Sequence, residues 1–257
     1  MGYIIFDTET GPEPESLLAE LFEFDETKVK DHHLTGQEFD PKSVRYGNMK
    51  DEQKRAEKLE AERKKFEAAK KAVAKSIETE RAEAWATFVE KAPLNPLTGR
   101  VVAIGYLGSN GQLNLVNGDG NEPAALRDFW QTVAMASRGN HQLIGFNSAG
   151  FDLPFLVRRS WRHGVPIPTE LVRSPNGRYW SPLFTDLLEL WSTGDRKAAK
   201  LDTIARFFGV GSKPDGMDGG DFHRLWAGSE EDRQRAANYL ENDLRMTQAV
   251  AERMGVV

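Results

Sequence analysis

The sequence predicts an α/β fold with a mixed sheet and a charged helical insertion. Short apolar runs rich in β-branched residues alternate with segments of helical periodicity, which is typical of α/β domains. Two of these runs flank a Ser-Asn-Gly turn, which predicts an antiparallel hairpin within the sheet. A long stretch rich in Ala, Glu, Lys and Arg interrupts the strand pattern after the first strand.

The first predicted strand is residues 3–6, a run of aromatic and β-branched side chains without polar alternation. Such a run indicates a central strand that is buried on both faces. The breaker cluster Gly-Pro-Glu-Pro follows at residues 11–14. We therefore expect the strand to end in residues 7–10.

A charged segment follows at about residues 25–99. Within it, residues 50–91 are rich in strong helix formers, and apolar residues recur along a narrow stripe. The stretch 54–75 holds nine Lys or Arg and four Glu, a local charge of +5. We expect a helical insertion, either a hairpin or one long arm, in a single domain spanning 1–257. Its charge favours a clamp on nucleic acid, and a structural arm or a partner-docking surface is the alternative.

The strand pattern resumes after the insertion. Residues 100–106 predict a buried strand, and the alternation of 112–116 predicts a half-exposed strand paired with it. Residues 123–137 have the periodicity of a helix. Residues 141–146 predict another buried strand, and a helix should follow it through about His163.

The C-terminal part is predicted to be helical and rich in loops. Residues 164–182 are punctuated by Pro and Gly, and a helix at 201–208 precedes the glycine-rich loop 209–220. A last helix is expected from Ser229 to about Arg253. Its start carries Ser followed three residues later by Asp, which fits a capping box.

Composition excludes several classes of protein. The chain of 257 residues is 39% hydrophobic and 28% charged, so a packed core is expected and wholesale disorder is not. The absence of cysteine excludes disulfide scaffolds, thiolate metal sites and cysteine nucleophiles. The net charge of −5 argues against a broad nucleic-acid-coating surface but allows a local basic groove. No signal peptide or membrane-length apolar run is evident, so we expect a cytoplasmic protein without a membrane partner.

Acidic residues follow two of the predicted strands. Asp7 and Glu9 lie two positions apart, so both side chains leave the same face of the sheet, about 7 Å apart along the strand. Asp152 stands in the first turn of a helix after a buried strand, where ligand sites of α/β sheets lie. Hard divalent cations take carboxylate ligands of this kind. A solvated strand end and an acid favoured by the helix dipole are the plain alternatives.

The last predicted helix carries a further polar pair. Tyr239 and Asp243 are four residues apart and therefore share one face of the helix. Neighbouring apolar residues at 236, 240 and 244 turn that side toward the sheet. The pair is either part of a site or a structural hydrogen bond.

In combination these motifs resemble the DEDD family of 3′–5′ exonucleases, within the ribonuclease H-like superfamily. The first motif is residues 6–10 (FDTET), and the second is Asn147 followed by 151–156 (FDLPFL). The second motif is most similar to the proofreading exonuclease domain of family-B DNA polymerases. The third motif, Tyr239 four residues before Asp243, resembles the tyrosine subclass.

The resemblance covers the chain except for roughly residues 25–99. It implies a ribonuclease H-like mixed five-stranded sheet flanked by helices. It also implies a metal-dependent 3′–5′ exonuclease that hydrolyses phosphodiester bonds from the 3′ end of single-stranded DNA and releases nucleoside 5′-monophosphates. A 3′–5′ exoribonuclease that trims RNA, or a non-catalytic module that binds nucleic acid or a replication partner, are the alternatives. We expect a free-standing nuclease or a subunit, with replication or repair proteins as partners.

The resemblance also implies a role for each site residue. Two divalent cations, Mg²⁺ or Mn²⁺, would be held by four carboxylates. Asp7 would bridge both ions, Glu9 and Asp243 would complete one ion site, and Asp152 would hold the second ion. Tyr239 would orient the attacking water.

Weaker signals predict contacts with the substrate. The expected contacts are Thr8, Asn147, Phe151, Arg158 and Lys213. The helix end 158–163 contains three arginines, Trp161 and His163, which would grip phosphates and stack a base, or would form a solvated basic end. Asp186 is either a secondary contact to substrate or metal, or a helix cap.

Overall fold

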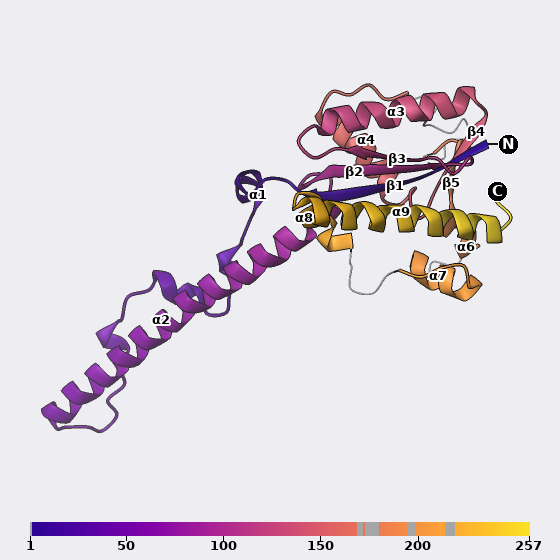
Figure 1. The fold of residues 1–257 in the computed structure, drawn as a ribbon. Helices are drawn as coiled ribbons and strands as arrows, with labels where there is room; N and C mark the ends of the chain where they lie inside the picture. The colour runs from indigo at the N-terminus through magenta and orange to yellow at the C-terminus, as the bar shows by residue number, and fades with distance from the viewer. Residues whose placement is uncertain (1, 169–171, 173–179, 195–198, 214–218) are drawn as a thin grey trace. The chain divides into compact units, whose positions relative to one another are not determined.

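The computed structural model describes residues 2–168, 172, 180–194, 199–213 and 219–257 (Figure 1). The chain divides into two compact units. The core unit consists of Met1–Leu17 and Ala92–Val257, and the insertion unit is Leu18–Lys91. The predicted loops 164–182 and 209–220 lie partly outside the described residues.

A five-stranded sheet forms the centre of the core unit. Its strands are β1 (Gly2–Pro12), β2 (Gly99–Gly108), β3 (Leu113–Asn117), β4 (His141–Gly145) and β5 (Phe184–Asp186). The order across the sheet is β3-β2-β1-β4-β5. The β1–β2 and β2–β3 pairs are antiparallel, whereas β1–β4 and β4–β5 are parallel. The predicted mixed five-stranded sheet is confirmed, although the short β5 was not recognised from the residues themselves.

Strand β1 is longer than its apolar run predicts. The expectation that it ends in residues 7–10 is wrong, because its pairing with β2 continues to Pro12 opposite Gly99. Its parallel pairing with β4 stops at Ile5, so in the described residues β1 beyond this point is paired only with β2. Proline is tolerated where one strand edge is unpaired, since no ladder hydrogen bond is lost there.

Helices cover both faces of the sheet (Figure 1). One face carries α3 (Glu122–Arg138) and α4 (Asp152–Arg162). The other carries α6 (Leu187–Ser192), α7 (Leu201–Phe208), α8 (Phe222–Trp226) and α9 (Glu230–Arg253). Successive residues of β1 alternate between the two layers, since Ile5 packs in the cluster with α9 and Phe6 packs in the cluster with α3 and α4.

The start of α9 is encoded locally. The Ser229 hydroxyl accepts a hydrogen bond from the Asp232 backbone N–H, and the Asp232 carboxylate accepts one from the Ser229 N–H. This is the predicted capping box. Helix α7 likewise spans the predicted residues 201–208.

The insertion unit is built on α2 (Glu52–Lys91), a single helix of 40 residues. This settles the choice between a hairpin and one long arm in favour of one helix. Residues 22–51 run antiparallel to α2, because Lys58 Nζ donates to the Arg45 carbonyl and Lys70 Nζ to the Gln37 carbonyl. Short 3-10 turns occur at Glu26–Lys28, His32–Gly36 and Pro41–Ser43.

Helix α1 (Glu15–Leu21) contains the boundary between the two units. No helix among the described residues is both long enough and apolar enough to cross a membrane.

Candidate active site

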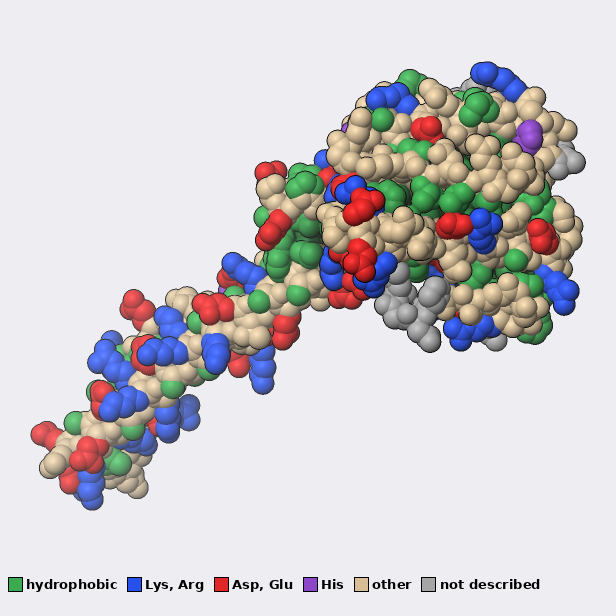
Figure 2. All heavy atoms as spheres, viewed as in Figure 1, with side chains coloured by type: hydrophobic (Ala, Val, Ile, Leu, Met, Phe, Trp, Pro, Cys, Tyr) green, Lys and Arg blue, Asp and Glu red, His purple; other side chains and the backbone are tan. Residues whose placement is uncertain are grey.

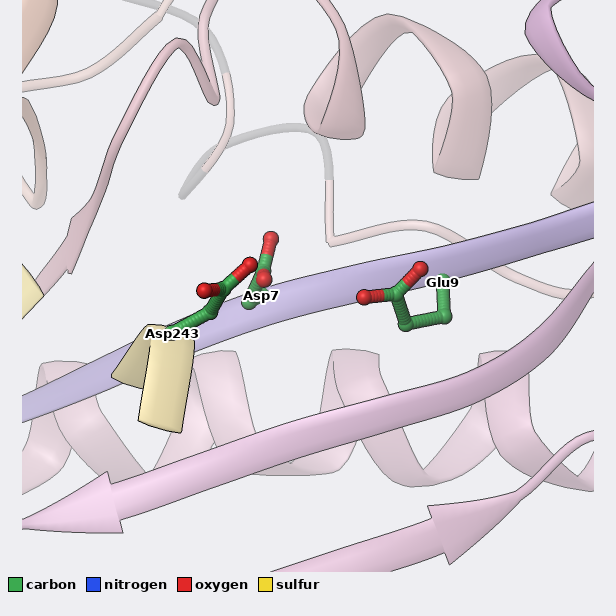
Figure 3. A group of neighbouring side chains, drawn as sticks. All are labelled: Asp7, Glu9 and Asp243. Atoms are coloured by element: carbon green, nitrogen blue, oxygen red, sulfur yellow. The ribbon is translucent and has the colours of Figure 1, made fainter. Parts of the chain in front are cut away.

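Three carboxylates converge between β1 and α9. Since Ile5 faces the α9 layer, the alternation of the strand turns Asp7 and Glu9 to the same layer. Asp243 approaches them from α9 (Figure 3). One carboxylate oxygen from each of these three residues can be chosen so that all three oxygens lie within 4.8 Å of one another. The structure therefore brings together three of the four acids expected to bind metal.

A glycine of β2 allows α9 to approach the sheet at this point. Gly105 is the partner of Asp7 in the β1–β2 ladder. A Cβ atom on Gly105 would lie 2.8 Å from Leu244 Cδ1 and 3.0 Å from Leu240 Cγ. A Cβ at this position would force the side chains of Leu240 and Leu244 on α9 to shift, so glycine permits this close packing of α9 on β2. The sequence analysis did not identify this residue.

Asp152 begins α4, lies outside this set of three and is 4% exposed. Its pKa is raised well above the ordinary value by burial and then by the charge of Asp7, so the two carboxylates interact. On the edge of β1 that pairs with β4, no further pairing occurs beyond Ile5 among the described residues.

Asp186 holds the loop that leads to Asp152. Its carboxylate accepts hydrogen bonds from the backbone N–H of Asn147 at 2.9 Å and of Ala149 at 2.8 Å. It also accepts one from Leu188 N at 2.8 Å and thereby caps α6. Of the two roles expected for Asp186, helix capping is the one the geometry supports, together with the positioning of this loop.

The electrostatics of the cluster favour bound cations. Burial, followed by the charge of Asp243, raises the pKa of Asp7 to about 7. Burial and the charges of Asp7 and Asp243 raise the pKa of Glu9 well above its ordinary value. One oxygen each of Asp152 and Asp243 is buried without a hydrogen-bond partner among the described residues. Clustered, underbonded carboxylate oxygens fit hard divalent cations, which would neutralise their repulsion.

Tyr239 and Lys213 border the cluster. Lys213 Nζ donates to Asp243 Oδ2 at 2.5 Å and to the Tyr239 hydroxyl at 2.6 Å, and it lies 4.5 Å from the centre of the tyrosine ring. The Lys213 backbone N–H donates to Asp202 Oδ1 at 2.6 Å. Burial acts to lower the pKa of Lys213, but the carboxylate of Asp243 and the hydroxyl of Tyr239 raise it above its ordinary value. The structure thus places the ammonium group of Lys213 in contact with Asp243, one of the clustered carboxylates.

The other expected substrate contacts lie around Asp152. Thr8 is buried on the opposite side of β1 from Asp7, and its backbone N–H donates to Asp7 Oδ1 at 3.0 Å. Asn147 is exposed and has a positive φ of 58°. Phe151 is half-buried and immediately precedes α4, and Arg158 is exposed on that helix.

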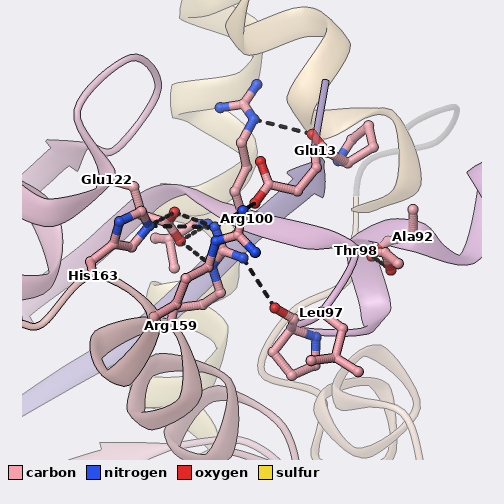
Figure 4. Close-up of polar contacts among 12 residues, drawn as sticks. Glu13, Ala92, Leu97, Thr98, Arg100, Glu122, Arg159 and His163 are labelled. Carbon is pink, nitrogen blue, oxygen red and sulfur yellow. Dashed lines mark hydrogen bonds and ion pairs between the residues drawn. The ribbon is translucent and has the colours of Figure 1, made fainter. Parts of the chain in front are cut away.

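The expectation that Arg159 grips phosphates is wrong. Its side chain is 1% exposed and donates to both carboxylate oxygens of Glu122, at 2.8 and 2.6 Å, and to Glu13 at 2.7 Å (Figure 4). A His163 ring nitrogen lies 2.7 Å from the same Glu122. The reason is helical periodicity, since Arg159 is seven residues after Asp152 and shares its buried face.

Comparison with known proteins identifies the family. Residues 94–256 match the model of a family described as predicted 3′–5′ exonucleases related to the exonuclease domain of PolB. The chain belongs to this family. The predicted resemblance to the exonuclease domain of family-B polymerases is therefore confirmed. The match includes Asp152, Tyr239 and Asp243, whereas β1 and the insertion unit lie outside it.

Two relatives of this exonuclease family member are DNA polymerases. A DNA polymerase of Archaeoglobus fulgidus is 24% identical over 142 residues, which cover 52% of this chain and 18% of the polymerase. The structure of the family B DNA polymerase from the hyperthermophilic archaeon Pyrobaculum calidifontis matches with a TM-score of 0.52 and 24% identity, covering 64% of this chain and 23% of the polymerase chain. The chain thus spans about a fifth of the length of these relatives, and the structural match supports the fold.

Proposed function

We propose that the chain is a metal-dependent 3′–5′ exonuclease that removes nucleotides from the 3′ end of single-stranded DNA as nucleoside 5′-monophosphates. The observation that carries this proposal is the convergence of Asp7, Glu9 and Asp243 within 4.8 Å, in a chain of a predicted exonuclease family. The named relatives are DNA polymerases, which supports DNA over RNA as the substrate.

Asp7, Glu9, Asp152 and Asp243 would hold two divalent cations, Mg²⁺ or Mn²⁺. When bound, such ions stabilise the attacking and leaving oxygens of a phosphodiester. The carboxylates supply hard oxygen ligands, and the ions in turn reduce the repulsion between the acids and the phosphates of the substrate. The raised pKa values of the acids support this role, because burial of like charges stores an electrostatic cost that a cation relieves.

Tyr239 would position the attacking water. Burial and the neighbouring Asp243 raise the pKa of Tyr239 above its ordinary value, so the hydroxyl is protonated at neutral pH. A protonated phenol acts through a hydrogen bond and not as a general base. The position of this hydroxyl beside Asp243 supports the proposed assignment to the tyrosine subclass of the DEDD exonucleases. Lys213 would neutralise Asp243 until ions bind and would contact the substrate afterwards, together with Thr8, Asn147, Phe151 and Arg158.

The test is incubation of the purified protein with 5′-labelled single-stranded DNA and RNA, with Mg²⁺, with Mn²⁺ and with excess EDTA. The expected result is a ladder that shortens from the 3′ end of DNA in either metal and is absent in EDTA. Mass spectrometry of the small products should show nucleoside 5′-monophosphates. Faster shortening of RNA would assign the exoribonuclease alternative. Absence of shortening in both metals, with nucleic acid still bound, would assign the non-catalytic alternative.

A further inference from the structure

The two faces of α4 have different surroundings. Asp152, Leu156 and Arg159 lie on the buried face. The opposite face carries Arg158 and Trp161, which are three residues apart and therefore adjacent on the helix surface. Trp161 is 67% exposed, and Arg158 is exposed and forms no hydrogen bond or ion pair with any residue that the structure describes. No structural role within the described parts of the core unit accounts for this pair.

Trp161 differs in its surroundings from Trp130, the tryptophan of helix α3. Trp130 of α3 is 4% exposed, and its indole N–H donates to Ser160 Oγ at 2.8 Å. The Trp161 ring has neither that burial nor a hydrogen bond within the described residues. Exposed large aromatic side chains beside polar groups mark contact surfaces.

The pair also lies on the helix that begins at the candidate active site. Since α4 starts at Asp152, a rise of 1.5 Å per residue places Arg158 about 9 Å and Trp161 about 13.5 Å along the helix axis. Phe151, half-buried just before the first turn, lies at the end nearer the acids. An aromatic ring, a cation and a second aromatic ring thus follow one another away from the acids.

We infer that Arg158 and Trp161 form an auxiliary binding track for the single-stranded nucleic acid whose 3′ end occupies the acid cluster. This inference rests on the proposed function. A single strand presents phosphates and unstacked bases, which bind to cations and aromatic rings in this combination. The acid cluster repels phosphates, so Arg158, which has no partner among the described residues and lies about 9 Å along α4 from Asp152, contributes attraction that the cluster itself lacks. Arg158 binds phosphate, and Trp161 stacks on a base several nucleotides from the 3′ end.

The affinity for single-stranded DNA, measured by fluorescence anisotropy, tests the inference. The 5′-labelled DNA has about 16 nucleotides, which is the upper end of the site sizes of compact single-strand-binding folds. Excess EDTA prevents cleavage during the measurement. Trp161→Ala should weaken binding by roughly 5- to 100-fold, the range seen for loss of one stacked base. Arg158→Ala should reduce the slope of log affinity against log salt by about 0.7, as expected for one lost phosphate contact. Trp161→Phe should restore most of the affinity.

Two matched controls come from elsewhere in the core unit. Phe207 of α7 is 73% exposed, and Arg138 at the end of α3 is exposed without a partner among the described residues. Phe207→Ala and Arg138→Ala should bind DNA as the unmodified chain does. A labelled dinucleotide should bind all variants equally, because it is too short to reach from the acids to Trp161.

The inference is overturned if Trp161→Ala and Arg158→Ala both bind the long DNA like the unmodified chain, or if the unmodified chain binds none. Equal losses in the control variants would also overturn it, because they would indicate non-specific attraction. If the binding effects occur but Mg²⁺ and Mn²⁺ support no shortening of DNA, the proposed function fails and the binding track stands. If DNA is shortened while the variants bind normally, only the binding track fails.

Discussion

The core unit and the insertion unit use charged residues in opposite ways. In the core, Arg159, Glu122, Asp152 and Asp243 are all less than 10% exposed. In the insertion, charged residues are exposed or partly exposed and none is buried, and Figure 2 shows basic and acidic side chains interspersed along it. A buried charge has a high desolvation cost, so its presence indicates a partner or a chemical role. Exposed pairs such as Lys65–Glu62 cost little and contribute little.

The difference also appears in how the two units are held together. The core buries apolar clusters on both faces of its sheet. The insertion has one small buried cluster of Val29, Val73 and Ile77, and basic side chains of α2 bond to carbonyls of the chain beside it. Substitutions in the core should therefore have large effects on the cleavage rate and on the free energy of unfolding. Substitutions in the insertion should have small effects on the affinity for nucleic acid.

The largest effect is expected for Asp7→Ala. Loss of a ligand central to the cluster should slow cleavage at least about a thousandfold, since bound ions contribute several kcal/mol to the transition state. The fold should survive with an equal or higher Tm, because removal of one clustered acid relieves repulsion. Glu252→Gln, at an exposed position of α9, is the control and should cleave normally. Single-turnover cleavage and thermal unfolding measure both parts, and a normal cleavage rate in Asp7→Ala contradicts the two-metal proposal.

Arg159→Met should lower the stability of the fold much more than a matched substitution in the insertion does. The variant leaves Glu122 and Glu13 buried without their ion pair, which should lower the free energy of unfolding by about 3–5 kcal/mol in urea titrations. Lys65→Met breaks the exposed pair with Glu62 in the insertion, and it should change stability by less than about 0.5 kcal/mol. Similar small decreases in the free energy of unfolding of both variants would contradict the proposed difference between buried charges in the core and exposed charges in the insertion.

Tyr239→Phe should separate positioning from metal binding. The ring remains and only the hydroxyl is lost, so Mn²⁺ affinity should stay near that of the unmodified chain. The cleavage rate should fall roughly 10- to 1000-fold, the scale for one positioned hydrogen-bonding group. Asp243→Asn should instead reduce Mn²⁺ affinity and rate together, because an amide is a poorer ligand for a hard cation. An unchanged rate, or a loss of metal equal to that of Asp243→Asn, refutes the role of the tyrosine.

The buried ion pair of Glu122 and Arg159 also predicts a pH dependence of stability in the core. Burial acts to raise the pKa of Glu122, but Arg159, the Val101 N–H and His163 together lower it below its ordinary value of 4.5. Ionised Glu122 therefore stabilises the fold above pH 4.5, and this contribution is lost as the pH falls through the lower pKa of the folded state. Glu13 faces the same guanidinium. Urea titrations should show a shallower acid loss in Glu122→Gln, and an identical profile would count against this assignment.

The smallest effect is expected in the insertion. Lys71 and Lys75 are exposed on α2, and their ammonium groups have no partner among the described residues, whereas the ammonium of Lys70 donates to the Gln37 carbonyl. If the insertion clamps nucleic acid, replacing Lys71 and Lys75 with Ala should weaken DNA binding about 2- to 10-fold and reduce the salt slope by up to about 1.4. Lys70→Ala should leave the slope unchanged. Unaltered affinity and slope in the double variant would leave the insertion as a structural arm or a surface for a protein partner.

Local features of the helix that carries Tyr239 and Asp243 could be predicted from the sequence, whereas the arrangement of the acids could not. The capping box at Ser229 and the spacing of Tyr239 and Asp243 depend on residues within one or two helical turns, so they could be read locally. The burial of Arg159 was accessible from the same periodicity but was missed, because a basic cluster at a helix end is usually solvated. Gly105 has no side chain, so no local motif marks it. Its importance becomes visible only in the tertiary structure, where Leu240 and Leu244 of α9 pack against it.

The sequence by itself determined the α/β class, the acidic motifs, the long helical segment and the N-terminal capping box of α9, because periodicity, propensity and capping act over a few neighbouring residues. Only the tertiary structure decided that β1 continues past its apolar run, because its partner β2 lies about ninety residues away in the chain. The same holds for the meeting of Asp7 with Asp243 and for the ammonium of Lys213 beside them. Strand pairing and helix packing join distant segments, and their energies depend on shape and burial that local patterns do not encode.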